Sequence, residues 1–115
     1  MTGPPPLQIH CTASGAELIK QMTADAICQR FVAAFGRARG IPVRARSDAP
    51  ASGLDVHLAI LPRGIAMATI IPVEGGVRAP MLRFNRAISD RAITLADIDH
   101  LAHDAVAGLD APAPR

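Results

Sequence analysis

Tryptophan and tyrosine are absent from this sequence of 115 residues, and only three phenylalanines supply aromatic side chains. Proteins that stack the bases of single-stranded nucleic acids need aromatic platforms, so the composition disfavours that class. Two cysteines are too few for a small disulfide scaffold. No apolar run approaches the roughly 18–20 residues that a transmembrane helix needs, so we expect no membrane partner.

Half of the residues are hydrophobic and 19% are charged, which excludes an intrinsically disordered chain. The length suits one hydrophobic core, and no repeat or long linker divides the sequence. We therefore predict a single domain over residues 1–115. Prolines near both termini predict flexible ends at residues 1–6 and 110–115.

The net charge is only +2, but the charges are segregated. Residues 30–46 carry five arginines and no acid, whereas residues 94–110 carry four aspartates and no base. Such a dipolar chain can pair with itself or with a charged partner. Eleven of the twelve basic residues are arginine, a bias that a GC-rich genome also produces.

The N-terminus lacks the basic and apolar regions of a secretory signal. This favours a cytoplasmic location, and in that compartment Cys11 and Cys28 are expected to be reduced.

The first third of the chain predicts a strand followed by helix. Leu7, Ile9 and Cys11 alternate with polar residues, as a half-buried strand does. Ser14 and Glu17 have the spacing of a capping box. The helical stretch that follows changes its apolar face, which predicts a break near Thr23, a good N-cap residue. Gly36 or Gly40 then ends the helix.

The rest of the chain predicts strands and a final helix. Alternation and turn residues indicate strands over residues 54–60, 65–73 and 77–85, with a further possible strand over 41–46. Pro80 marks an edge or a bulge. Thr94 to Asp97 caps the last helix, which Gly108 and the prolines end. The expected fold class is α+β, a two-layer β-α-β-β-β-α domain with an antiparallel meander covered by helices. The expected core contains Phe31, Phe35, Leu58, Ile60, Ile70, Ile98 and Leu101.

Cys11 is a candidate catalytic nucleophile, because a thiol between a strand and a helix start can have a depressed pKa. His10-Cys11 resembles the start of the protein tyrosine phosphatase signature, which places an arginine six residues after the cysteine. Glu17 stands at that position and would repel phosphate. The alternative is that Cys11 is a small buried hydrophobic residue of the strand, and this is the interpretation that we favour.

His100 and His103 are one helical turn apart on the polar face of the last helix, with Asp97 and Asp104 predicted nearby. His100, His103 and Asp104 are therefore candidate metal ligands, although a metal site needs three or four ligands in total. An ordinary solvated face explains the same pattern, and we expect no metal or other cofactor.

Arg44, Arg46, Arg78 and Arg83 fall on predicted strands and are the candidate binding residues. Together on one sheet face they could bind phosphate. The order helix, three strands, helix resembles the double-stranded RNA-binding domain in outline. That family has a lysine-rich start to its second helix, where this chain is acidic over residues 94–99. We therefore do not expect nucleic acid as a partner.

Motifs for phosphate loops, dinucleotide binding, nucleophile elbows and redox-active cysteine pairs are absent. The sequence thus favours a small non-catalytic binding or assembly module that acts through protein–protein contacts, with a protein partner or a second copy of itself. The alternatives are an enzyme that depends on Cys11 and a weak nucleic-acid-binding domain.

Overall fold

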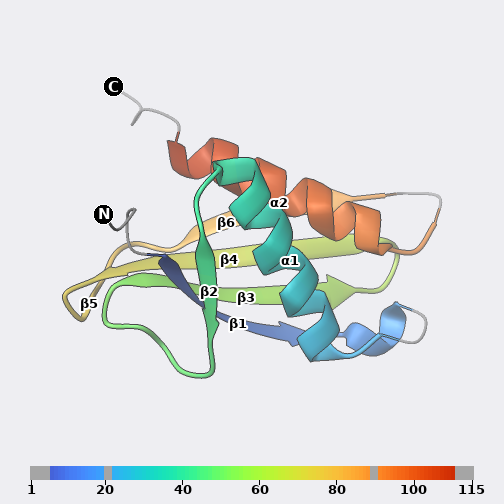
Figure 1. Ribbon diagram of the computed structural model, residues 1–115. Coiled ribbons are helices and arrows are strands. Elements are labelled where there is room, and N and C mark those ends of the chain that lie inside the picture. The colour runs from blue at the N-terminus through green and yellow to red at the C-terminus, as the bar shows by residue number, and fades with distance from the viewer. Residues whose placement is uncertain (1–5, 20–21, 89–90, 111–115) are drawn as a thin grey trace.

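The computed structural model describes residues 6–19, 22–88 and 91–110. In these ranges it has two α-helices, one short 3-10 helix and six strands. Their bounds are β1 (Leu7–Ser14), η1 (Ala16–Leu18), α1 (Ala24–Arg39), β2 (Val43–Arg46), β3 (Gly53–Leu61), β4 (Ile65–Glu74), β5 (Val77–Arg78), β6 (Leu82–Ala87) and α2 (Leu95–Asp110). The fold is two-layer α+β, as the sequence predicts (Figure 1).

All six strands belong to one sheet, in the order β2-β1-β3-β4, with β6 and the short β5 both pairing with β4. Strands β3, β4 and β6 form the expected antiparallel meander. Strand β1 adds a feature that the periodicity of the sequence does not show, because it runs parallel to both β2 and β3. A parallel neighbour requires a long crossover, and α1 provides it between β1 and β2.

Both helices lie on the same face of the sheet, in front of it in Figure 1. Helix α1 packs on β1 and β2, helix α2 packs on β4 and β6, and the helices pack on each other. The inward residues of β3 and the middle of β4 are buried against this layer, and their neighbours in sequence point the other way. The expected core is confirmed, because all seven of its residues are buried in one cluster.

The predicted break near Thr23 is confirmed. Helix α1 begins at Ala24, where the Thr23 side chain accepts a hydrogen bond from the backbone N–H of Ala26, and Gly40 caps its C-terminus. The predicted capping box of Ser14 and Glu17 is wrong. Ser14 is the last residue of β1 and pairs with Ala59 of β3. It therefore belongs to the sheet, although its spacing from Glu17 predicted a helix N-cap.

The third meander strand is interrupted rather than continuous over residues 77–85. It is divided into β5 and β6 around Pro80, since proline has no N–H to donate to the ladder. At the other end of the chain, the prediction that Gly108 stops the last helix is wrong, because α2 continues to Asp110. A Cβ on Gly108 would overlap the ring of Phe84, so this glycine allows α2 to approach β6 closely.

Asp97 is fully buried at the start of α2, and its predicted place beside the exposed histidines is therefore wrong. Arg91 donates to both carboxylate oxygens, at 2.6 and 3.1 Å, and Arg86 donates from β6 at 3.0 Å. The backbone N–H and the hydroxyl of Thr94 donate at 2.9 and 3.1 Å. These bonds, that of Arg91 first, hold the pKa of Asp97 well below its usual range despite burial.

One pair of opposite charges from the two segregated segments meets at the surface between α1 and α2. Arg30 of α1 donates twice to the Asp99 carboxylate of α2, both times at 2.8 Å. This fork lowers the pKa of Asp99. Because α1 and α2 are neighbours, the basic and acidic segments pair within one chain here, so their separation no longer argues for self-association.

We predict that Asp97→Asn lowers the free energy of unfolding by about 3 kcal/mol, because it removes the charge that compensates two partly buried arginines. The measurement is urea denaturation at neutral pH. Ionised Asp97 contributes its full stability above about pH 4, the ordinary aspartate range, and that contribution falls as the pH drops toward the lowered native pKa. The matched control is Asp104→Asn on the exposed face of α2, for which we expect a change below about 0.5 kcal/mol. Equal effects of the two variants would contradict this role of Asp97.

Candidate functional site

Cys11 offers no thiol for catalysis, because it forms a disulfide with Cys28 of α1. The expectation that both cysteines are reduced is wrong. The Cα atoms are 5.7 Å apart, which is within the range that a disulfide requires. The alternation of β1 does direct Cys11 toward the helix layer, as expected, and there it meets Cys28 across the β1–α1 contact. Cys28 follows Cys11 by 17 positions in the sequence, which is too far for a local motif to reveal the pair.

The predicted metal site on the last helix has no further ligand among the described residues. His100, His103 and Asp104 are exposed on the outer face of α2 as predicted, but Asp97 is committed to its arginines. Among the described residues, no group of three or more histidine, cysteine, aspartate or glutamate side chains is close enough to hold a metal ion. Within those same residues, no helix has the length and apolar character of a membrane span.

The four candidate binding arginines share one side of the sheet, opposite the helices. Paired residues on neighbouring strands point to the same face. Arg44 and Arg46 pair with Gln8 and His10, and Arg83 pairs with Thr69. Each partner alternates with a buried residue that points to the helices. The fourth, Arg78, bonds to Asp55, which pairs with His10 on the same side.

We call this side the open face, because no described helix or strand lies over it. It consists of the strand residues that point away from α1 and α2, together with Arg78. From β2 to β6 they are Arg44, Arg46, Gln8, His10, Thr12, Ser14, Gly53, Asp55, His57, Ala59, Leu61, Ile65, Met67, Thr69, Ile71, Val73, Arg83, Asn85 and Ala87. Val73, at the end of β4, is buried.

One part of the open face is an ordered polar cluster on β1 and β3. Asp55 bonds to Nδ1 of His10 and to the Arg78 guanidinium, both at 3.0 Å. The ring nitrogens of His57 lie 2.7 Å from the Thr12 hydroxyl and 3.3 Å from the Ser14 hydroxyl. Hydroxyls thus occupy both nitrogens of His57, and no described carboxylate orients it as a base. The arrangement is not that of a serine hydrolase.

The other part is aliphatic and centred on β4. Ile65, Met67 and Ile71 alternate along this strand and remain partly exposed, and Leu61 of β3, which pairs with Ile65, is 38% exposed. These side chains point away from the helix layer, and the next outward residue along β4, Val73, is buried. The open face thus has an aliphatic centre and arginines toward its edges.

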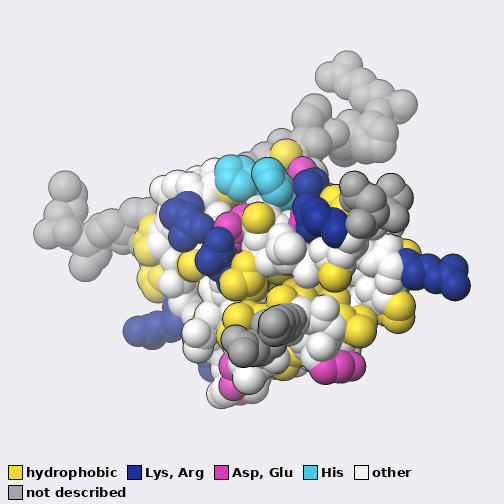
Figure 2. Space-filling model, turned by 90° about the vertical axis from the view of Figure 1, so that its right-hand side faces the viewer, with side chains coloured by type: hydrophobic (Ala, Val, Ile, Leu, Met, Phe, Trp, Pro, Cys, Tyr) yellow, Lys and Arg dark blue, Asp and Glu magenta, His cyan; other side chains and the backbone are white. Residues whose placement is uncertain are grey.

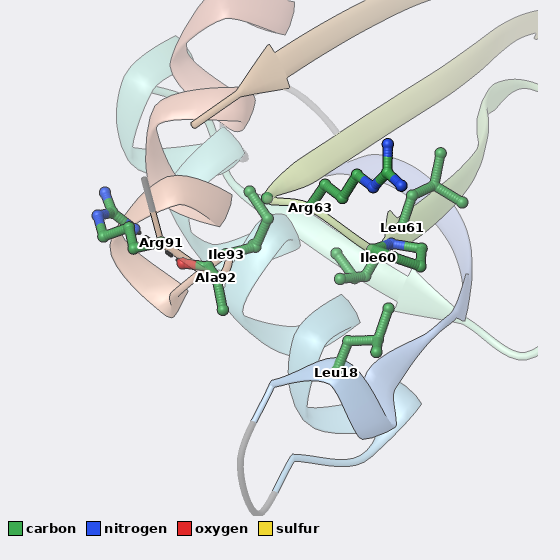
Figure 3. Close-up of a pocket in the computed structure, with 9 residues that line it drawn as sticks. Leu18, Ile60, Leu61, Arg63, Arg91, Ala92 and Ile93 are labelled. Carbon is green, nitrogen blue, oxygen red and sulfur yellow. Dashed lines mark hydrogen bonds between the residues drawn. The ribbon is translucent and has the colours of Figure 1, made fainter. Parts of the chain in front are cut away.

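Apart from the open face, a hollow lies at the end of the molecule that faces the viewer in Figure 2, where hydrophobic side chains gather. Its volume is about 390 Å³, and an adjoining hollow of about 540 Å³ shares Leu18, Ala92 and Ile93 with it. Figure 3 shows Leu18 pointing toward Ile60, while the guanidinium groups of Arg63 and Arg91 point away from the hollow. With no converging polar groups, this hollow lacks the features of a catalytic pocket.

Sequence reasoning found the arginines of the open face but missed its aliphatic centre and its polar cluster. The residues of β4 alternate between small buried alanines and larger outward side chains, the reverse of the usual pattern in which the larger apolar residue is buried. Ala66 and Ala68 point to the helices, and Ile65 and Met67 point to the open face. That reversal in the sequence was the signal that could have predicted the aliphatic centre of the open face.

Comparisons with known proteins assign neither a family nor a function to this chain. No family model matches the chain, and neither a curated protein nor a solved structure matches it.

We predict that reduction of the disulfide lowers the free energy of unfolding by about 3 kcal/mol, because the bond closes a loop of 17 residues. Urea denaturation with and without dithiothreitol measures this change. The control is the double variant Cys11→Ser, Cys28→Ser, whose stability should not respond to the reductant. Two titratable thiols in the unreduced native protein would contradict the prediction.

Proposed function

We propose that this protein is a small non-catalytic binding or assembly module that docks another protein on its open face. The observation that carries the proposal is the row of aliphatic residues Ile65, Met67 and Ile71 on β4, which point away from both helices and are partly exposed. Burying aliphatic side chains under a partner removes apolar area from water, which is the main driving force of protein association.

Two of the alternatives lose support. An enzyme that depends on Cys11 requires a thiolate, and this cysteine is oxidised. Self-association through paired open faces would bring the arginines of one copy against those of the other, which costs free energy. Nucleic-acid binding keeps one favourable observation, the four arginines on one face, and the experiment below separates it from protein binding.

The test places a photo-crosslinking residue, p-benzoylphenylalanine, at Met67 in the cells that make the protein. The matched control position is His103, which is exposed on the outer face of α2. We expect adducts at Met67 in several-fold higher yield than at His103. Adducts that a protease digests and a nuclease leaves intact support a protein partner.

Other results overturn the proposal. Equal yields at the two positions, or none at Met67, mean that the open face is not the docking surface. A nuclease-sensitive adduct assigns the face to nucleic acid. An adduct of twice the chain mass assigns it to self-association.

The cytoplasmic location is also a proposal, and the disulfide provides its test, because such bonds persist mainly in oxidising compartments. Alkylation of intact cells with N-ethylmaleimide before lysis traps the cysteines in their native state. Alkylated Cys11 and Cys28 support the cytoplasm, whereas an intact disulfide argues against it.

A further inference from the structure

We propose that the partner of the open face is an acidic amphipathic helix, with an aliphatic stripe flanked by carboxylates. This inference rests on the proposed function and names the chemistry of the docked segment.

The charge of the open face is unbalanced. Four arginines belong to it, and the only acid among its residues is Asp55, which Arg78 and His10 share. Arg46 pairs with Asp48 in the loop after β2. Arg44 and Arg83 form no ion pair with any described residue, and Arg83 makes only a 3.9 Å contact with the Met81 sulfur. The face therefore has unneutralised positive charge for a partner to meet.

The unpaired cations lie at opposite edges. Arg44 is on β2 and Arg83 is on β6, with β1, β3 and β4 between them. Four strand spacings separate these edges by about 19 Å. The aliphatic residues of β4 run for roughly 20 Å between Ile65 and Ile71. A helix is about 10–12 Å wide with its side chains, so a helix laid over β3 and β4 covers the stripe and directs side chains toward both edges.

The composition of the face favours protein over nucleic acid. It has no phenylalanine, tyrosine or tryptophan: Phe31 and Phe35 are buried in the core, and Phe84 lies on the helix side of β6. Its only ring side chains are His10 and His57, which are hydrogen-bonded to neighbouring side chains, so base stacking has few platforms here. A sugar-phosphate backbone also has no apolar surface to pack on Ile65, Met67 and Ile71, whereas leucines of a helix do.

The experiment uses fluorescence anisotropy with a labelled 14-residue helical peptide that has a leucine stripe flanked by glutamates. The comparison probes are the same peptide with lysines in place of glutamates and a 20-nucleotide single-stranded RNA. We expect the glutamate peptide to bind and its affinity to fall with salt. The double variant Arg44→Gln, Arg83→Gln should weaken it about tenfold.

The control double variant is Arg37→Gln, Arg63→Gln, which removes the same charge outside the open face and should change the affinity less than twofold. Three results overturn the inference. The lysine peptide binds as tightly as the glutamate peptide, the glutamate peptide does not bind at millimolar concentration, or the two double variants have equal effects. Tighter RNA binding that depends on Arg44 and Arg83 also overturns it and favours a nucleic-acid site. If Met67 crosslinks to a protein but the glutamate peptide does not bind, the proposed function is still supported and only the inference of an acidic helix is wrong.

Discussion

The hydrophobic core lies between two helices and a single face of the sheet, and the rest of the molecule depends on that packing. Alternation along each strand divides the sheet residues into a set that the helices bury and a set that they leave outside. Since α1 and α2 also pack on each other, both are held on one side. Four arginines, the histidines of β1 and β3 and the outward aliphatic residues of β4 thereby lie on the other.

Two further interactions hold the helix layer in place. The disulfide attaches the first turns of α1 to β1, and buried Asp97 attaches the start of α2 to Arg86 of β6 and to Arg91. Both act at the boundary between helix and sheet. A rigid sheet is the precondition for a docking face, because ordering a flexible surface on binding costs free energy.

The open face combines two chemistries that are separated in the sequence. Its cations lie on β2, β5 and β6, and its aliphatic centre lies on β3 and β4. In the docking that we propose, aliphatic contact would supply affinity, and charge at the edges would steer the partner and select the sign of its charge. The polar cluster around Asp55 and His57 is satisfied internally, so it orders the surface without assembling a reaction centre.

Local patterns in the sequence determined the fold class, the core and most element boundaries, because these depend on alternation, helical period and caps. Thr23 as an N-cap, the inward phase of Ile98 and Leu101, and the outward phase of His100 could all be predicted. Contacts between residues far apart in sequence were decided only by the tertiary structure. The parallel place of β1 puts Cys11 against Cys28 and His10 beside Asp55, and the approach of β6 to α2 buries Asp97. No spacing in the sequence predicts these contacts, since each depends on how whole helices and strands pack. The same packing brought Arg44 and Arg83 to one face, so the candidate residues were predictable one by one, whereas the surface that they form was not.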